Sequence, residues 1–445
     1  MSSLGIVICY PLQWHWVLSL ENTLQQRQNR SIVTVFDFST TDGRRALINR
    51  IPFTPFWKFR RKAVSLLREN NINYVRVRYS LISKFIALAK AISSKYPAII
   101  DANTDKYASI FPSLVDLIDD TQIDLRRFRK YVIYERYKSI LIRSHLKNLI
   151  GGGFNRVTTV NGRFTKNYEV RLWGQSNETE VTFLEFGATK DSYEEYLVSP
   201  HSFNELAQKM MGSWDGSENQ KQVARKYFQE LIGFDRYAGI SWTKEMISGE
   251  LPKLPVGMRV CTFFTSTQKE FVGVGDAEDD SLFENQFVAF DALQKELTSA
   301  GDWFIVIRRH PKFLNVQHDA DGKYWERYKA FKNVIIVEPD SQVDSYALGH
   351  RSDLVAHFNS SIAIQLVYGG HRSVLTLGNA MWSELLPGTV ARSQSAISEF
   401  LATKTKDWTS EMTLPWAYFR ATYGNEFEFF EFDSGSNGWK FINLI

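Results

Sequence analysis

Short apolar runs alternate with longer stretches of helical periodicity along almost the whole chain. In the first half, apolar runs at residues 5–10 (GIVICY), 31–39 (SIVTVFDFS) and 73–79 (NYVRVRY) predict strands, and the pattern over 56–70 predicts a helix. Strands that recur after each helix are typical of parallel sheets covered on both faces. The pattern therefore predicts α/β domains.

The same alternation starts again after a stretch rich in Pro and Gly, GELPKLPVG at residues 249–257. Beyond it, residues 258–266, 302–311 and 352–358 read as strands, and 281–301 as an amphipathic helix that ends at a glycine. A chain of 445 residues is long for one hydrophobic core. We therefore predict two doubly wound domains that enclose a cleft, with ligands at the carboxyl ends of the strands.

Polar side chains follow four predicted strands of the second half, at the point where each strand ends. Hydroxyl groups donate hydrogen bonds without bulk, and a guanidinium offers paired donors to phosphate oxygens. We therefore expect a ligand that carries phosphate at these strand ends. The residues are Thr265 and Ser266 after the first strand, Arg308 and His310 after the second, Asp344 after the third, and Asn359, Ser360 and Ser361 after the fourth.

The cluster Asn359-Ser360-Ser361 stands between a predicted strand and a predicted helix. Asn359 or Ser360 is suited to be the N-cap of that helix, and capping alone would account for the cluster. Exposed N–H groups at a helix start also suit phosphate, and the other polar strand ends favour this second interpretation. Gln365, one turn into the helix, is placed either to reach a ribose hydroxyl or to lie on the helix surface.

Six stretches, in this order, resemble the capsule-polysaccharide-biosynthesis family of glycosyltransferases, which includes Kdo transferases of capsule and of lipopolysaccharide O-antigen assembly. The resemblance extends over about residues 155–430. The stretches are TVNGRFTKNYEVRLW, VTFLEFG, TFFTSTQKEFVGVGD, VIRRHP, NVIIVEPDSQVDSYAL and SDLVAHFNSSIAIQLVYGGHRSVLTLG.

The resemblance implies a GT-B architecture, in which two Rossmann-like domains face each other across a cleft. It implies an acceptor-side domain over 1–240, a nucleotide-sugar domain over 241–415, and a segment 416–445 that crosses back to the first domain. It also implies a glycosyltransferase that moves a sugar from a CMP- or NDP-activated donor to a surface polysaccharide or lipid-linked glycan. The family often carries an acidic residue where this chain has Gln365, which leaves the donor's base and sugar open.

Candidate roles follow from this resemblance. The donor phosphate is expected at Arg308, His310 and the Asn359–Ser361 turn, with Thr265, Ser266, Asp344 and Gln365 nearby. On the acceptor side, Asn161 and Arg163 match the family's Asn-Gly-Arg turn and Glu185 its Glu-x-Gly. Glu185 is a candidate general base or a salt-bridge partner of Arg163. No motif demands a bound metal or another cofactor, so we expect metal-independent transfer. His15, after the first strand, is either catalytic or a packing residue.

Charge is distributed unevenly. Residues 1–150 hold 24 Lys and Arg against 11 Asp and Glu, a net of +13, whereas the remainder carries −9. A basic first third suits an anionic partner or a solvated surface. Residues 124–149 combine basic and apolar positions at helical spacing, which predicts either a peripheral membrane contact or a core helix with a basic outer face.

The two cysteines, Cys9 and Cys261, lie in apolar runs, which indicates a reducing compartment and no disulfide framework. The apolar start has no basic region before it, so we interpret it as a buried strand and expect a cytoplasmic protein, with membrane association through 124–149 as a further possibility. No nucleic-acid-binding motif is apparent. Two alternatives keep the fold: transfer of glycerol phosphate from CDP-glycerol, or an inactive scaffold subunit of a polysaccharide assembly complex.

Overall fold

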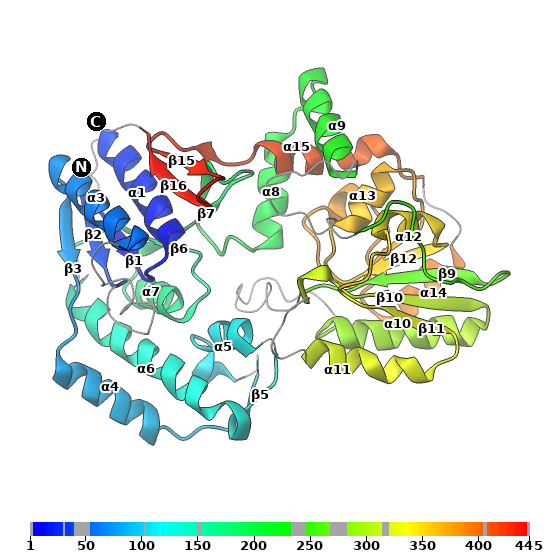
Figure 1. Ribbon diagram of the computed structural model, residues 1–445, viewed down its shortest axis with the longest axis horizontal. Helices are drawn as coiled ribbons and strands as arrows, with labels where there is room; N and C mark the ends of the chain where they lie inside the picture. The colour runs from blue at the N-terminus through cyan, green and yellow to red at the C-terminus, as the bar shows by residue number, and fades with distance from the viewer. Residues whose placement is uncertain are drawn as a thin grey trace.

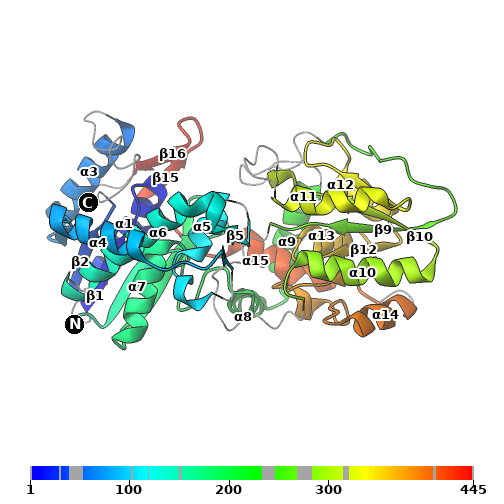
Figure 2. The same cartoon turned by 90° about the horizontal axis from the view of Figure 1, so that it is seen from below.

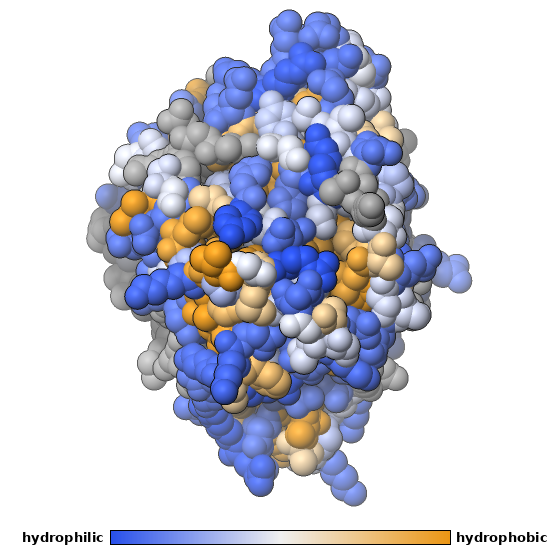
Figure 3. All heavy atoms as spheres, turned by 90° about the vertical axis from the view of Figure 1, so that its right-hand side faces the viewer, coloured by the Kyte–Doolittle hydropathy of each residue, from blue (hydrophilic) through white to orange (hydrophobic). Residues whose placement is uncertain are grey.

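The computed structural model describes residues 3–29, 32–39, 54–101, 104–118, 120–149, 153–232, 246–267, 283–313, 320–403 and 407–442. These residues form two α/β domains, each built on its own sheet, that lie side by side (Figure 1). The end of the molecule formed by the second domain is largely hydrophilic at its surface, with hydrophobic residues gathered in smaller groups (Figure 3).

The first sheet has seven strands in the order β14-β8-β7-β6-β1-β2-β3. Strands β3, β2, β1, β6 and β7 run parallel, while β8 and β14 are antiparallel additions at one edge. The chain therefore leaves β1 in one direction for β2 and β3, then returns to its other side for β6 and β7. The bounds are β1 (Ser3–Ile8), β2 (Ile32–Asp37), β3 (Asn73–Arg76), β6 (Arg156–Val160), β7 (Glu180–Phe186), β8 (Ser192–Tyr196) and β14 (Asn425–Glu426).

Alternate residues of β1 enter two separate cores, as expected of a strand buried on both faces. Leu4 and Ile6 pack in the core that includes α1 and α3, whereas Val7 and Cys9 pack with α6 and α7. A short pair, β4 with β5, belongs to a smaller core with α5 and the start of α6. The bounds are α1 (Gln13–Gln28), α3 (Pro55–Glu69), α4 (Leu81–Ser93), β4 (Ile99–Ile100), η1 (Asp105–Tyr107), α5 (Phe111–Ile118), β5 (Ile123–Asp124), α6 (Leu125–Leu149) and α7 (Thr165–Ser176).

The second sheet has five parallel strands in the order β11-β10-β9-β12-β13. Helices α10 and α14 lie on one side of this sheet and α12 on the other (Figure 2). The strand bounds are β9 (Arg259–Phe264), β10 (Trp303–Arg308), β11 (Val334–Val337), β12 (Leu354–His357) and β13 (Val374–Thr376). The helix bounds are α10 (Gln286–Ala300), η4 (Pro311–Phe313), α11 (Ala320–Glu326), η5 (Arg327–Ala330), α12 (Ser345–Arg351), α13 (Ile362–Tyr368), η6 (Ser383–Leu385) and α14 (Gln394–Ala402).

The parallel strands of both sheets follow one order. Numbered along the chain within each domain, they read 3-2-1-4-5, the order of a Rossmann-like doubly wound sheet, with the direction of winding reversed between strands 1 and 4. Two doubly wound domains of this kind define the GT-B architecture. The fold class predicted from the sequence is thus confirmed.

Helices α8 (Phe203–Ser213) and α9 (Glu218–Ile232) share a core with the second domain, because Met210 and Phe228 pack there together with α13 and α15 (Leu414–Thr422). The sequence interpretation placed both helices in the first domain, and its boundary near residue 240 lies outside the described residues. Amphipathic helices follow whichever apolar surface accepts them, so the linker pattern did not indicate this attachment.

After α15 the chain returns to the first domain. Strand β14 pairs with β8, and the hairpin of β15 (Phe430–Asp433) and β16 (Gly438–Phe441) packs in the core that holds α1 and α3. The buried Glu21 carboxylate of α1 accepts the backbone N–H groups of Glu428 and Phe429 at 2.8 and 3.1 Å. The two ends of the described chain are therefore fastened together.

The membrane contact predicted for 124–149 does not agree with the packing of α6. Its apolar residues Phe128, Val132, Leu141, Ile142 and Leu146 are buried in two cores, so they cannot enter a bilayer. The other interpretation, a core helix with a basic outer face, describes it. Among the described residues, no helix is both long and apolar enough to cross a membrane.

Candidate functional site

The second sheet changes its winding direction between β9 and β12, and the loops that leave these two strands meet there. The hydroxyl oxygen of Ser266, just beyond β9, accepts the backbone N–H of Asn359, just beyond β12, at 3.0 Å. In open α/β sheets, ligands bind at this reversal, outside the carboxyl ends of the strands. We refer to the Ser266–Asn359 junction as the switch-point turn.

Neighbouring groups hold the turn in place. The Thr265 hydroxyl accepts the backbone N–H of His310 at 2.9 Å, which joins the ends of β9 and β10. Gln286, buried at the start of α10, accepts the Ser266 N–H at 2.9 Å and donates to the Ser266 carbonyl at 3.0 Å. The ends of three adjacent strands are thus fixed by two side chains that directly follow β9 and by one from the start of α10.

His357 holds the backbone of the polar cluster Asn359-Ser360-Ser361. Its Nδ1 accepts the backbone N–H of Ser360 at 3.1 Å, so Nε2 carries the proton and donates to Thr376 Oγ1 at 2.9 Å. Burial lowers the pKa of His357 to about 3, which keeps the ring neutral. The predicted N-cap is wrong, because α13 begins after Ser361 and that residue makes no side-chain capping bond.

The side-chain oxygen of Asn359 is shielded from solvent and has no hydrogen-bond partner among the described residues. It lies against Gly378, where an added Cβ would approach Asn359 Oδ1 to 2.4 Å. The absence of a side chain at Gly378 therefore leaves room for this amide. Buried polar atoms without partners are uncommon in native proteins and are explained by a bound group or strain.

Arg308 does not have the position that a phosphate ligand requires. It is 2% exposed and donates to Ser345 Oγ at 3.2 Å and to the backbone oxygens of Glu338 and Ser341 at 2.6 and 3.4 Å. Burial lowers the pKa of Arg308 to about 10, although the negative charge of Asp340 acts to raise it. The two-residue period of β10 explains the error, because Arg308 shares a face with Phe304 and Val306, toward α12.

Two further predicted donor-site residues stabilise the scaffold. Gln365 is buried, and its amide oxygen accepts the Tyr346 hydroxyl at 2.6 Å, so it ties α13 to α12 and does not offer a ribose contact. Asp344 is the N-cap of α12, where it accepts the N–H groups of Tyr346 and Ala347 at 2.9 and 3.1 Å, and it also accepts the Gly249 N–H at 2.9 Å.

The first sheet has its own cluster at the ends of β6 and β7. Asn161 adopts a left-handed conformation (φ 64°), and Gly162 follows at φ 78°, so the chain turns sharply as β6 ends. The Asn161 amide nitrogen donates to Glu185 Oε2 at 2.8 Å and lies 3.0 Å from His201 Nε2. Two residues predicted from the sequence thus meet at the carboxyl edge, and His201 joins them.

Glu185 is a half-buried carboxylate with an altered proton affinity. Desolvation raises its pKa, and the hydrogen bonds from Asn161 and the Phe186 N–H and the charge of Arg163 partly oppose this shift. The Arg163 side chain lies over the Phe164 ring, 5.3 Å from its centre. A carboxylate held in this way can accept a proton more readily than an exposed one.

His15 stands at the start of α1, beside the Tyr10 ring at 5.3 Å between ring centres. It is 1% exposed, and neither ring nitrogen has a hydrogen-bond partner among the described residues. Burial, and then the charge of Lys166, lower its pKa to about 3. Lys166 donates to the Cys9 carbonyl at 2.9 Å, at the end of β1.

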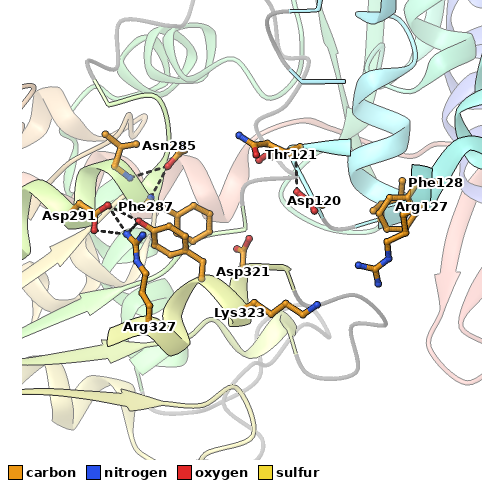
Figure 4. Close-up of a pocket in the computed structure, with 14 residues that line it drawn as sticks. Asp120, Thr121, Arg127, Phe128, Asn285, Phe287, Asp291, Asp321, Lys323 and Arg327 are labelled. Carbon is orange, nitrogen blue, oxygen red and sulfur yellow. Dashed lines mark hydrogen bonds and ion pairs between the residues drawn. The ribbon is translucent and has the colours of Figure 1, made fainter. Parts of the chain in front are cut away.

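A cavity of about 630 Å³ lies between the two domains (Figure 4). Asp120, Thr121 and Arg127 line it from the first domain, across from Asn285 and Asp321 of the second. Gln286 donates to Asp321 at 3.1 Å as well as to the Ser266 carbonyl, so this wall of the cavity is joined to the switch-point turn. A volume of this size suits a small-molecule ligand.

In the described part of the chain, no three His, Cys, Asp or Glu side chains gather where they could hold a metal ion. The sequence AEDDSL at residues 277–282 is acidic and is predicted to be a solvated loop, and it lies outside the described residues.

Comparison with solved structures finds likeness to several proteins at the level of the fold. The chain is similar to KpsC of Thermosulfurimonas dismutans, a beta Kdo 2,4 transferase (11% identity, 59% of this chain and 79% of that one, TM-score 0.37). It is also similar to the UDP-GlcNAc 2-epimerase of Methanocaldococcus jannaschii (9% identity, 94% of this chain and 98% of that one, TM-score 0.30). A third similar structure is the spinosyn rhamnosyltransferase SpnG (9% identity, 96% of this chain and 97% of that one, TM-score 0.25). At these values the likeness concerns the fold alone.

No family model matches the chain, and no curated protein matches it either. The resemblance to the capsule-polysaccharide-biosynthesis family therefore remains a prediction.

Sequence reasoning missed three residues that shape the site: His201, Gln286 and His357 as a turn anchor. His201 and Gln286 carry no local signal, since each acts on a residue 20 or more positions away. His357 ends an apolar strand directly before the polar cluster, and that position was the only available indication.

Proposed function

We propose that this protein is a metal-independent GT-B glycosyltransferase that transfers a sugar from a nucleotide-activated donor to a surface polysaccharide or lipid-linked glycan. The observation that carries the proposal is the Ser266–Asn359 hydrogen bond at the switch point of the second sheet, beside a cavity lined by both domains. The similarity of the six sequence stretches to capsule-polysaccharide enzymes supports the same class.

In this proposal the donor's phosphates lie at the switch-point turn. Ser360 supplies a small hydroxyl group, and the buried Thr265 and Ser266 hold the turn in position. His310 brings an imidazole whose Nδ1 already accepts the Lys312 N–H at 3.1 Å. The neutral tautomer of His310 then carries its proton on Nε2. Arg308 acts as a positioning residue, because it fixes the loop between β11 and α12.

Transfer requires a bond from the acceptor oxygen to the anomeric carbon of the donor sugar, while the bond from that carbon to the phosphate breaks. Glu185 is proposed to take the proton of the acceptor hydroxyl, and the leaving phosphate is stabilised at the second domain. Asn161 holds the Glu185 carboxylate by its amide, which is a positioning role.

The experiment is a thermal-shift screen with CMP, CDP, UDP, GDP, dTDP and ADP, followed by product analysis with the matching sugar nucleotide with and without EDTA. A nucleotide at about 100 times its Kd should add roughly 2.7 kcal/mol of stability. CMP alone would indicate a nonulosonate donor, and CDP the glycerol phosphate alternative. If none shifts the melting temperature, the donor site is refuted and the scaffold alternative gains support.

A further inference from the structure

Helix α4 presents its large apolar side chains to solvent. Its buried residues are Ala87 and Ala91, and α4 packs side by side with α6 (Figures 1 and 2). Leu81, Ile82 and Phe85 are 83%, 73% and 73% exposed, and Ile86, Leu88 and Ile92 are exposed as well. The helix is thus attached by its smallest residues, while the largest ones face outward.

The exposed residues form one continuous stripe. Leu81, Phe85, Leu88 and Ile92 recur at intervals of four, three and four residues, which places them along one face of the helix. Ile82 and Ile86 extend this stripe to one side. Monomeric soluble proteins rarely leave so many large apolar residues together at the surface, and such groups mark binding surfaces.

The surroundings of the stripe are basic. Between residues 70 and 100 the chain carries Arg76, Arg78, Lys84, Lys90 and Lys95 and no Asp or Glu. Lys90 and Lys95 are exposed. Arg129 of α6 is also exposed, and it lies close enough to this segment for its charge to oppose the rise that burial causes in the pKa of Tyr96. An apolar stripe on a segment that carries cations suits a surface that is apolar inside and anionic outside.

We propose that α4 docks this protein flat on an anionic phospholipid membrane. The apolar stripe enters the boundary between headgroups and acyl chains, and the lysines and arginines contact lipid phosphates. A second copy of the chain fits less well, because it would bring the same cations face to face. A 13-residue helix is also only about 20 Å long, and one such face offers less than the roughly 800 Å² per partner of a stable protein interface.

The test is flotation of the full chain with vesicles of phosphatidylglycerol and phosphatidylcholine, or of phosphatidylcholine alone. The wild type should float with the anionic vesicles and lose binding as salt rises. Leu81→Ser with Phe85→Ser should weaken binding roughly a hundredfold, because two large apolar side chains no longer leave water. The matched control is Leu197→Ser with Val256→Ser, at positions that are 64% and 100% exposed elsewhere, and it should bind like the wild type.

A charge variant tests the second half of the proposal. Lys90→Glu with Lys95→Glu should weaken binding to anionic vesicles at least roughly tenfold, whereas Lys253→Glu with Lys332→Glu, exposed on the other domain, should leave binding unchanged. All eight positions substituted in the variants and their controls are exposed, so circular dichroism should show folded variants. Equal binding by the wild type and both α4 variants overturns the proposal.

Self-association is an outcome of the same experiment. If the wild type sediments as a dimer and Leu81→Ser with Phe85→Ser as a monomer, α4 binds a second copy and the membrane proposal fails. Vesicle binding needs no nucleotide, so its result is independent of the proposed transfer reaction.

Discussion

The hydroxyl oxygen of Ser266 accepts the backbone N–H of Asn359 at 3.0 Å, and this bond joins residues 93 positions apart. It closes the point where the second sheet reverses its winding. Gln286 holds Ser266 on both its N–H and its carbonyl, so neighbouring side chains fix the position of the turn.

Ser266→Ala should leave the Asn359 N–H without its partner and lower the free energy of unfolding by about 1–3 kcal/mol. Nucleotide affinity should fall at least tenfold, measured by calorimetry beside urea denaturation. Thr262→Val is the control. Thr262 lies in β9, the strand that precedes Ser266, and its hydroxyl is hydrogen-bonded to the Ser352 hydroxyl at 2.7 Å, away from the turn. Thr262→Val should lose stability and keep its nucleotide affinity. An unchanged nucleotide affinity in Ser266→Ala would contradict the placement of the nucleotide at the switch-point turn.

Gly378→Ala should displace the switch-point turn. The new Cβ would lie 2.4 Å from Asn359 Oδ1 and 2.5 Å from the Phe358 carbonyl oxygen. Because the turn must move to relieve this overlap, the free energy of unfolding should fall by about 1–3 kcal/mol, and nucleotide binding should be lost. In Gly212→Ala the Cβ meets nothing within 4 Å inside α8, so that variant should gain up to about 1 kcal/mol. Similar melting temperatures for the two variants would argue against a tightly packed turn.

Glu185→Gln should separate stability from activity. The raised pKa of Glu185 means that the folded protein binds this proton more tightly than the unfolded chain, so the wild type loses stability as pH rises above about 4.5. Glu185→Gln does not titrate and should gain stability relative to the wild type over that range. Transfer should fall by about 10²- to 10⁴-fold while nucleotide binding persists.

The measurement for Glu185 is urea denaturation of both proteins from pH 4.5 to 8, beside an activity assay. A stability difference that does not change with pH would show that Glu185 has an ordinary proton affinity. Normal transfer by Glu185→Gln would remove it from the proposed base role.

His357 should make the protein sensitive to mild acid. Its pKa falls from 6.5 to about 3 on folding, so its contribution to stability is complete above pH 6.5 and is lost as pH falls from there toward 3. His357→Gln keeps an acceptor for the Ser360 N–H and should show less acid destabilisation between pH 7 and 4. Identical acid transitions in the wild type and in His357→Gln would exclude a neutral buried His357.

Glu21→Ala should loosen the segment that returns to the first domain. Loss of the carboxylate leaves the N–H groups of Glu428 and Phe429 without partners, at a cost of about 1–3 kcal/mol. Hydrogen exchange should quicken over residues 425–442, and the second sheet should keep its protection. Glu69→Ala, on the exposed side of α3, should change neither region. Unchanged exchange in Glu21→Ala would mean that apolar packing alone holds the hairpin.

The positions of candidate site residues were more predictable than their roles. Thr265, Ser266 and Asn359 lie where the strand pattern placed them, at carboxyl ends. Arg308 and Gln365 also follow the predicted elements, yet both are buried and bonded inside the second domain. A strand buried on both faces shows no contrast between its two sides, so its sequence does not reveal which face a terminal arginine joins.

For helices too, the sequence predicted the element but not which of its faces is buried. The pattern over 124–149 predicted a helix, and α6 is one, but packing decided that its apolar side lies in two cores. Helix α4 has the opposite arrangement, with alanines inside and leucine, isoleucine and phenylalanine outside. Hydrophobic periodicity locates an apolar face, whereas only the neighbouring elements determine whether that face is covered.

The sequence by itself determined two doubly wound domains, because alternating strand and helix periods are local properties of each segment. Tertiary structure alone decided that β9 and β12 become neighbours, that Gln286 holds Ser266, and that His201 joins Asn161 and Glu185. These contacts depend on how crossovers bring distant segments together. Local chemistry gives a side chain its capacity to donate or accept a hydrogen bond, and the fold chooses its partner.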